Sequence, residues 1–149
     1  MYISKYLNEK LVVFLEEETR EGAISCLVDL LHQENKIDDK EAFRHAILER
    51  EKIVSTGIGI EVAIPHAKVS GKSEFFMAIG LQKGKGIDWK ALDGSLVRLI
   101  FMIGGPDNRQ TEYLKLLSGL TLLIKEEERR KRLLKCRTAK EVIDLFTGC

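Results

Sequence analysis

The sequence is poor in cysteine and proline, with three cysteines and two prolines among its 149 residues. Cys26, Cys136 and Cys149 are odd in number, and no two of them have the Cys-x-x-Cys spacing. This pattern excludes a disulfide framework and a cysteine zinc site, and it is typical of a reducing compartment. We therefore expect a cytoplasmic protein that has no metal site and whose fold depends on its hydrophobic core.

The sequence also lacks an excess of either charge and any long apolar run. Its 24 lysines and arginines against 23 aspartates and glutamates give a net charge of +1. Nucleic-acid binding requires a strongly basic face, so the composition argues against it. The run Leu96–Gly105 is too short to cross a bilayer and contains Arg98. Residues 1–15 lack the pattern of a signal peptide. We expect a soluble chain that does not insert into a membrane.

What is present is the composition of a globular domain. Hydrophobic residues make up 44% of the chain and charged residues 32%, values that separate it from disordered sequences. A length of 149 residues is enough to bury a core, and no repeat, linker or low-complexity segment divides it. We expect one domain over residues 1–149.

Several segments have the patterns of helices. Thr19 is a candidate N-cap for a helix whose apolar stripe consists of Ile24, Leu27, Val28 and Leu31. A helix after Pro106 has one apolar face, formed by Tyr113, Leu116, Leu117, Leu120 and Ile124. The segment Glu126–Arg132 has oppositely charged pairs at i,i+4, which favours a solvated helix surface. Thr138 and Glu141 have the spacing of a capping box for a last helix.

One predicted helix carries an arginine on its inward side. Asp38 and Glu41 resemble a capping box for a helix that runs to about Arg50. Phe43 and Ile47 form its inward stripe, and Arg50 continues that stripe at helical spacing. A guanidinium therefore projects from the core-facing side of the last helical turn, which is an unusual place for a merely solvated charge.

Two nearly continuous apolar runs, Phe75–Leu81 and Leu96–Ile103, indicate strands that are covered on both faces. Glycine-containing turns lie between them, at Gly84–Gly86 and Asp93–Gly94. Together with the helices, these strands predict an α/β fold in which a central mixed β-sheet is sandwiched by helices.

A single histidine follows a short strand with an alternating pattern. Residues 60–64 alternate apolar and other side chains, and Pro65 should end the strand because it has no N–H to donate. His66 comes next, and the positive charge of Lys68 follows. Imidazole titrates near neutral pH, so this arrangement suits chemistry on an anion, with a phosphoryl group accepted by His66 as the leading hypothesis. The alternative is a rim histidine with one structural hydrogen bond.

Three consecutive parts of the sequence resemble the active-site segment of a known family. These are Glu49–Glu51, Ser55–Gly59 and Ile64–Lys68. The combination of an arginine-bearing helix end, a Ser-Thr-Gly-Ile-Gly turn and Pro-His resembles the IIA proteins of the bacterial phosphotransferase system. It is similar to the fructose/mannitol-type (type 2) superfamily, and within that superfamily most similar to the nitrogen-regulatory IIA subgroup.

The resemblance implies that His66 is the phosphoacceptor and that Arg50 stabilises the transferred group. We further predict Lys68, Tyr113 and Thr56 as phosphate-binding residues. Phosphoryl transfer between histidines requires positioning and charge stabilisation, so no cofactor and no metal are expected. Gly57-Ile58-Gly59 lacks the further residues of a nucleotide-binding loop, and nothing indicates ATP.

The implied partners are proteins. The donor would be an HPr-like phosphocarrier, and the acceptor a sugar permease IIB domain or a regulatory target. The alternative function is a regulatory binding protein of the nitrogen-IIA kind, with little or no onward transfer. In that case the charge of phospho-His66 would change which target docks.

The sequence departs from the family at Tyr113, because many members carry a second histidine at the corresponding position. A phenol can donate a hydrogen bond but stays neutral at pH 7. Tyr113 could instead belong to the core. Structural roles also stay open for the two cations: Arg50 could form a salt bridge with Glu61, and Lys68 could be an ordinary surface residue. His32 and His45 are expected to be structural.

Overall fold

A mixed six-stranded sheet forms the centre of the fold. In the computed structural model, which describes residues 3–149, the strands are β1 Val12–Phe14, β2 Gly57–Gly59, β3 Val62–Ala63, β4 His66–Lys68, β5 Phe76–Leu81 and β6 Leu99–Gly105. The α-helices are α1 Arg20–Gln33, α2 Lys40–Ile53, α3 Gln110–Ile124, α4 Glu127–Lys135 and α5 Ala139–Asp144. Two short 3₁₀ helices, η1 Ile3–Tyr6 and η2 Glu9–Leu11, precede β1.

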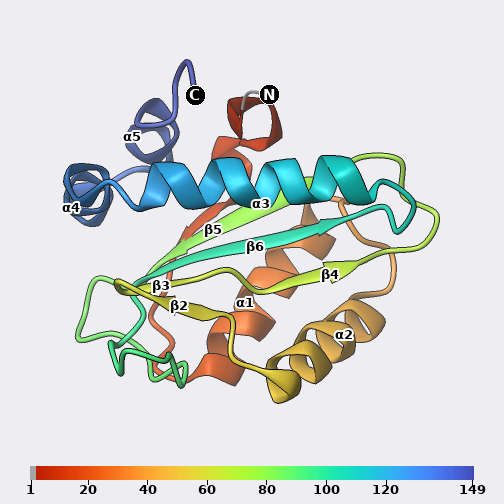
Figure 1. Cartoon of the computed structure of the whole chain (residues 1–149), viewed down its shortest axis with the longest axis horizontal. Coiled ribbons are helices and arrows are strands. Elements are labelled where there is room, and N and C mark those ends of the chain that lie inside the picture. The colour runs from red at the N-terminus through yellow and green to blue at the C-terminus, as the bar shows by residue number, and fades with distance from the viewer. Residues whose placement is uncertain (1–2) are drawn as a thin grey trace.

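The strands follow the order β1-β5-β6-β3-β2, and β4 also pairs with β6. β5 and β6 are antiparallel, whereas β1 runs parallel to β5, and β3 and β4 run parallel to β6. Helix α3 lies across one face of the sheet, and α1 and α2 lie on the other (Figure 1). Separate hydrophobic clusters fill the two faces. The predicted α/β sandwich around a mixed sheet is therefore confirmed.

The central strands are buried along their whole length, as their apolar runs predicted. Every residue of β5 and of β6 is buried. Strand β6 begins at Leu99 and extends to Gly105, so the start that was expected at Leu96 is wrong. Leu96 is exposed in the loop before the strand, and Val97 forms only an isolated bridge with Ile87.

The helix starts are set by side-chain caps. The Thr19 hydroxyl accepts a hydrogen bond from the Gly22 N–H at 3.0 Å, which confirms the predicted cap of α1. Helix α2 begins one residue later than predicted, because Asp39 caps it and accepts from the Ala42 N–H at 3.0 Å. Asp38 instead forms an ion pair with Lys72. The helix continues past Arg50 to Ile53.

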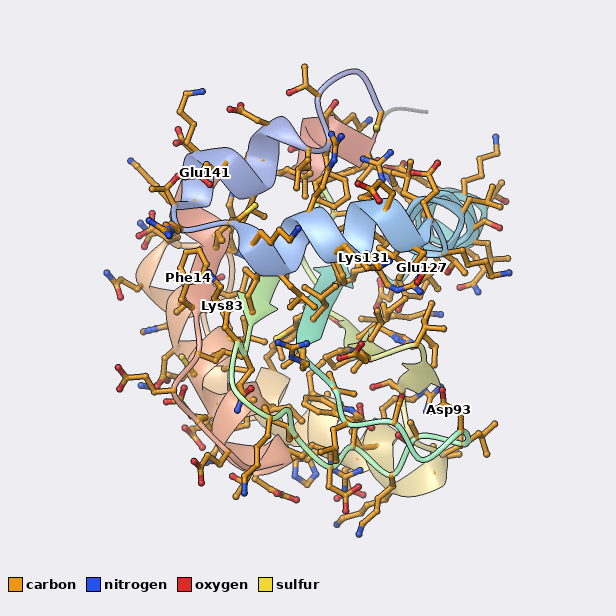
Figure 2. The ribbon with its side chains drawn as sticks, turned by 90° about the vertical axis from the view of Figure 1, so that its left-hand side faces the viewer. Phe14, Lys83, Asp93, Glu127, Lys131 and Glu141 are labelled. Atoms are coloured by element: carbon orange, nitrogen blue, oxygen red, sulfur yellow. The ribbon has the colours of Figure 1, made fainter. Side chains whose placement is uncertain are left out.

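The charged helix α4 faces solvent as predicted. Glu127 pairs with Lys131 at 3.4 Å across one helical turn (Figure 2), and Glu128 pairs with Arg132 at 3.4 Å. Glu126 pairs with Arg129, three residues on, and not with the residue at i+4. At the last helix, the Thr138 hydroxyl accepts from the Glu141 N–H at 3.2 Å, which confirms the predicted cap. Among the described residues, no helix has both the length and the apolar character needed to cross a membrane.

The segment before the histidine is a hairpin and not one continuous strand. Ile60 and Glu61 have positive φ angles of 53° and 69° and form the turn between β2 and β3. The Asp93 carboxylate accepts from the Ile60 N–H at 3.0 Å and ties this turn to the neighbouring loop. The alternating pattern of residues 60–64 therefore misled the strand prediction, because its first residues belong to the turn.

Candidate functional site

His66 is the first residue of a strand, so the expectation that strand pairing stops at Pro65 is wrong. β3 and β4 both pair with β6, and His66 of β4 lies opposite Ile103 of β6. Pro65 interrupts the two short strands, yet its carbonyl still accepts from the Ile103 N–H at 3.0 Å. The sheet therefore continues past the proline, and its pairing holds the backbone of His66 beside Ile103 of β6.

Among the described residues, one of the two ring nitrogens of His66 has a hydrogen-bond partner and the other has none. Its Nδ1 lies 2.7 Å from the Ile64 carbonyl oxygen. A carbonyl oxygen only accepts, so Nδ1 carries the proton and the Nε2 of the neutral ring keeps its lone pair. Burial lowers the pKa of His66 below its ordinary value, and the charge of Arg50 lowers it further, whereas the bond to Ile64 opposes the shift. The ring is therefore held neutral and nucleophilic at Nε2.

Arg50 lies in the last turn of α2 and is half-buried. Its Nη1 donates to the Val54 carbonyl at 2.8 Å. Its charge lowers the pKa values of both His66 and Tyr113, which places the guanidinium within electrostatic reach of the two rings. The alternative ion pair with Glu61 does not form, because Glu61 pairs with Arg98 at 3.4 Å.

Tyr113 belongs both to the core and to the site. It is 6% exposed, and its ring stacks on Phe75 with centroids 5.6 Å apart. It also meets the edge of the His66 ring at 5.8 Å and 64°. Within the part of the chain that the structure describes, its buried hydroxyl has no hydrogen-bond partner. Burial raises the pKa of Tyr113 well above its ordinary value, so the phenol remains a neutral donor.

Lys68 follows His66 by two residues on β4, so the two side chains lie on the same side of the strand. Its ammonium group is exposed and donates to the Gln110 side-chain oxygen at 2.8 Å. An ammonium has three hydrogens, so this contact leaves donors available.

Thr56 is placed differently from the other four predicted residues. It is 5% exposed, and its hydroxyl donates to the Glu51 carboxylate while accepting from Trp89 Nε1 at 3.2 Å. A hydroxyl has one hydrogen, and here Glu51 receives it. Thr56 thus offers the site no free donor, and the structure brings together His66, Arg50 and Tyr113 without it.

Sequence reasoning gave Glu51 no role, although it lies in the segment Glu49–Glu51 that carries the resemblance, and it did not single out Trp89. Glu51 is 5% exposed and lies four residues after Ile47, at the same helical spacing that marked the inward stripe. That spacing was a usable signal for a buried carboxylate. Trp89 is fully buried, but its contact with Thr56 spans 33 residues, and no local pattern announces it.

Exposed apolar side chains follow directly on site residues. Ile53 and Val54, after Arg50, are 80% and 51% exposed, and Leu114, after Tyr113, is 55% exposed. The two remaining histidines, His32 and His45, are exposed on helices. Among residues 3–149 no group of three histidine, cysteine, aspartate or glutamate side chains could hold a metal ion.

Comparisons with known proteins match nearly the whole chain to one family. The family model described as "Phosphoenolpyruvate-dependent sugar phosphotransferase system, EIIA 2" matches residues 5–148. A fructose-specific EIIA component from Haloferax volcanii is 36% identical over 91% of this chain and 88% of its own length. A fructose-specific EIIABC component from Bacillus subtilis is 37% identical over 89% of this chain, but the chain spans only 21% of that protein.

Similarity extends to nitrogen-regulatory proteins. A nitrogen regulatory protein from Bradyrhizobium diazoefficiens is 30% identical over 72% of this chain and 70% of its own length. The crystal structure of the nitrogen regulatory protein IIA-Ntr from Neisseria meningitidis superposes with a TM-score of 0.89 at 28% identity, over 97% of this chain and 98% of that one. Sequence identity is therefore higher to the fructose relatives, whereas this structural match is to a regulatory protein.

Proposed function

Because the chain belongs to the EIIA type 2 family of the phosphoenolpyruvate-dependent sugar phosphotransferase system, we propose that His66 carries a phosphoryl group from an HPr-like donor protein to an acceptor protein. The chain is an EIIA domain of the fructose/mannitol type. The observation that carries the proposal is the 2.7 Å contact between His66 Nδ1 and the Ile64 carbonyl, which leaves Nε2 free. A neutral, oriented imidazole is the nucleophile that this chemistry requires.

In the proposed transfer, the Nε2 lone pair of His66 attacks the phosphorus of the donor's phosphohistidine. A new N–P bond forms as the donor's N–P bond breaks, and that electron pair returns to the donor imidazole. The Nδ1 proton of His66 stays on the hydrogen bond to Ile64 throughout. The same step in the reverse direction, with an acceptor nucleophile, passes the group onward. No metal or nucleotide takes part in this balance.

Three side chains would receive the phosphoryl oxygens. Arg50 offers a planar guanidinium that suits phosphate, and Lys68 offers an ammonium on the same side of β4. The Tyr113 hydroxyl would donate the hydrogen bond for which the described residues provide no acceptor. Charge-assisted bonds of this kind contribute about 1.5–3 kcal/mol each, so the two cations would carry most of the stabilisation.

The acceptor we propose is a IIB domain. One chain in a solved complex of the Escherichia coli mannitol IIA with phosphorylated IIB has the same fold as this chain, with a TM-score of 0.81 at 21% identity over 96% of this chain and 98% of that one. The exposed apolar residues beside the site, Ile53, Val54 and Leu114, would provide the contact surface for donor and acceptor in turn.

A regulatory role is the second candidate. It is favoured by the TM-score of 0.89 with the Neisseria IIA-Ntr protein and by the neutral Tyr113 beside His66. In this role phosphorylation of His66 adds a charge of about −2 to the apolar surface and so changes which target protein binds. The first phosphoryl transfer, from donor to His66, is common to both candidates.

A reconstituted phosphorelay tests the proposal. The protein is mixed with phosphoenolpyruvate, enzyme I and an HPr-type donor, and its intact mass is followed at neutral pH. We expect an acid-labile phosphate adduct on the wild type and on His45→Ala, which removes an exposed histidine, but none on His66→Ala. No adduct on the wild type, or an adduct that persists in His66→Ala, would overturn the proposed function. Transfer from the phosphorylated protein to a IIB domain then separates carrier from regulator.

A further inference from the structure

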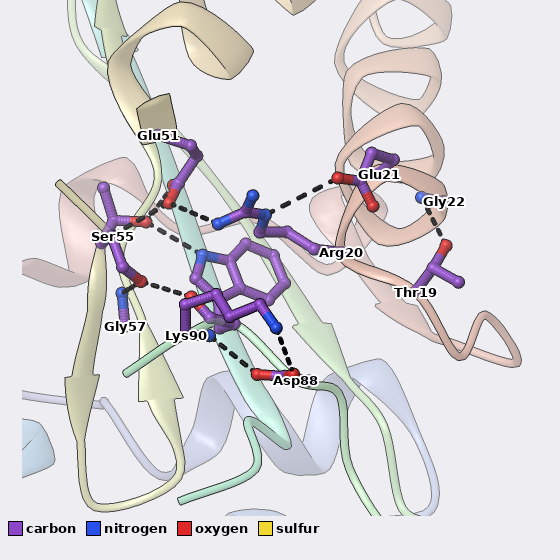
Figure 3. Close-up of polar contacts among 11 residues, drawn as sticks. Thr19, Arg20, Glu21, Gly22, Glu51, Ser55, Gly57, Asp88 and Lys90 are labelled. Atoms are coloured by element: carbon purple, nitrogen blue, oxygen red, sulfur yellow. Dashed lines mark hydrogen bonds and ion pairs between the residues drawn. The ribbon is translucent and has the colours of Figure 1, made fainter. Parts of the chain in front are cut away.

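A buried polar network lies behind the site, with Glu51 at its centre. The Glu51 carboxylate accepts from the Thr56 N–H at 2.9 Å and from the Thr56 hydroxyl, and that hydroxyl accepts from Trp89 Nε1. Arg20 extends from the start of α1 toward Glu51, with Nη1 3.8 Å from the carboxylate (Figure 3). A buried carboxylate with this many partners has little freedom to move, because each lost bond would leave a polar group unpaired.

One path leads from this network to His66. The Thr56 carbonyl accepts from the Ile64 N–H at 3.0 Å, and the Ile64 carbonyl accepts from His66 Nδ1 at 2.7 Å. Two successive hydrogen bonds therefore connect the residue that Glu51 holds with the nitrogen that sets the tautomer of His66. A displacement of Thr56 would move Ile64 and weaken the bond that keeps Nε2 free.

A second path leads to Arg50. The two bonds between Glu51 and Thr56 span residues 52–55, which comprise the end of α2 and the start of its connection to β2. Within that segment, the Val54 carbonyl accepts from Arg50 Nη1 at 2.8 Å. Ser55 adds a further tie, because its hydroxyl donates to the Trp89 carbonyl and accepts from the Gly57 N–H at 3.0 Å. The anchor of the guanidinium is thus held by the same network.

We propose that Glu51 is a positioning residue for phosphoryl transfer, which through Thr56 sets both the anchor of Arg50 at Val54 and the anchor of His66 at Ile64. This inference rests on the proposed function of His66. Glu51 itself touches neither the phosphoryl group nor the reacting nitrogen. The Glu51 charge also raises the pKa of His66 against the effect of burial. The proposed role in transfer is geometric, because misplacement of a reacting group by about 1 Å can cost about a hundredfold in rate.

The test compares Glu51→Gln with Glu49→Gln. The amide NH₂ group introduced by Glu51→Gln could not accept from the Thr56 hydroxyl, and the charge that faces Arg20 would be lost. Glu49, by contrast, is exposed and pairs with Lys52 on the surface of the helix. We expect Glu51→Gln to lower the phosphorylation rate at least about tenfold, at a temperature where the variant is folded. Glu49→Gln should phosphorylate like the wild type. A wild-type rate for folded Glu51→Gln would overturn the inference.

Spectroscopy of the ring nitrogens distinguishes positioning from simple destabilisation. In ¹⁵N-labelled protein, the signals of His66 report which nitrogen carries the proton, and comparison with His66→Ala identifies them among the three histidines of the chain. We expect Glu51→Gln to shift His66 toward a mixture of tautomers. A lower melting temperature with unchanged His66 signals would show that Glu51 only stabilises the fold, and would contradict the proposal.

Thr56 supplies the second variant if Glu51→Gln does not fold. Thr56→Val removes the hydroxyl but keeps the shape and the backbone N–H, whereas Thr56→Ser keeps the hydroxyl. We expect slow transfer and a tautomer mixture in Thr56→Val and recovery of both in Thr56→Ser. Equal behaviour of the two variants would contradict the inference. If the wild type takes no phosphate, the proposed function fails, and the tautomer comparison still decides the role of Glu51.

Discussion

The rings of His66 and Tyr113 meet edge to face, with centroids 5.8 Å apart and planes inclined at 64°. Tyr113 is held there by its parallel stack on Phe75, so the tyrosine forms a rigid wall of the site. Its hydroxyl is buried without a partner among residues 3–149. A buried hydroxyl in this situation destabilises the unphosphorylated protein, and a phosphoryl oxygen on His66 would satisfy it.

We predict that Tyr113→Phe shortens the lifetime of phospho-His66 about fivefold, the equivalent of about 1 kcal/mol for one neutral hydrogen bond. The melting temperature should stay the same or rise, because the variant removes an unpaired polar group. Intact-mass decay and thermal unfolding measure the two effects. Tyr6→Phe is the control: it removes a hydroxyl that donates to Glu112 at 2.9 Å, so it should leave the lifetime unchanged. An unchanged lifetime in Tyr113→Phe would assign the tyrosine to the core alone.

Replacement of Arg50 should affect transfer far more than stability. We predict that Arg50→Gln lowers the phosphorylation rate by about tenfold or more, because a charge-assisted contact to the phosphoryl oxygens is lost. Among residues 3–149, the Arg50 side chain makes one hydrogen bond, to the Val54 carbonyl, so its loss should cost the native protein little. Rates from the phosphorelay and melting temperatures are compared with those of Arg44→Gln, an arginine of the same helix that pairs with Glu41. A large fall in melting temperature with normal transfer would mark Arg50 as structural.

The pH dependence of stability should carry the signature of His66. Burial lowers its pKa in the folded protein below 6.5, so under that pH the unfolded chain binds a proton that the folded protein does not. The free energy of unfolding should therefore fall as pH drops from 6.5 toward the folded pKa, and recover as pH rises. Urea unfolding over this range should show a shallower fall in His66→Ala. Equal slopes in the wild type and His66→Ala would contradict the prediction.

The hairpin before the site should be sensitive at Gly59. Its φ angle is +85°, and an added Cβ would lie 2.7 Å from the Asp93 carboxylate that holds the turn. We predict that Gly59→Ala lowers the free energy of unfolding by more than the strain alone, which is about 1 kcal/mol. Gly71→Ala separates the two contributions, because Gly71 has a φ of +80° in open space. Chemical denaturation measures both, and equal losses would show that Asp93 simply moves aside.

Local patterns predicted much of this fold. Residue spacing over a few positions predicted the helix caps at Thr19 and Thr138 and the strands that are buried on both faces. Such features depend on neighbouring residues, so they can be predicted from the sequence alone. The cap of α2 was misplaced by one residue, because Asp38 and Asp39 are adjacent and only the tertiary pairing of Asp38 with Lys72 decides between them. Pairing of β4 with β6 past Pro65 depends on a distant strand and has no local signal.

Candidate site residues were predicted where they follow a period or a motif. The helical stripe that contains Phe43 and Ile47 predicted Arg50 on the inward side of its helix, where it is half-buried, and the resemblance singled out His66. Thr56 illustrates the limit. Its partners are Glu51, five residues back, and Trp89, 33 residues on, so the direction of its hydroxyl is set by tertiary packing. A polar residue in a motif can therefore support the site by holding the backbone in place, without contacting the substrate.

The ring nitrogen that carries the phosphate decides whether transfer runs through Nε2 of His66. The ¹⁵N-labelled protein, phosphorylated in the relay, is examined for the ring nitrogen bonded to phosphorus. The bond between Nδ1 and the Ile64 carbonyl predicts a phosphoryl group on Nε2 of His66, with Nδ1 still protonated. Phosphate on Nδ1 of His66, on another histidine, or on no histidine at all would contradict the mechanism derived from this structure.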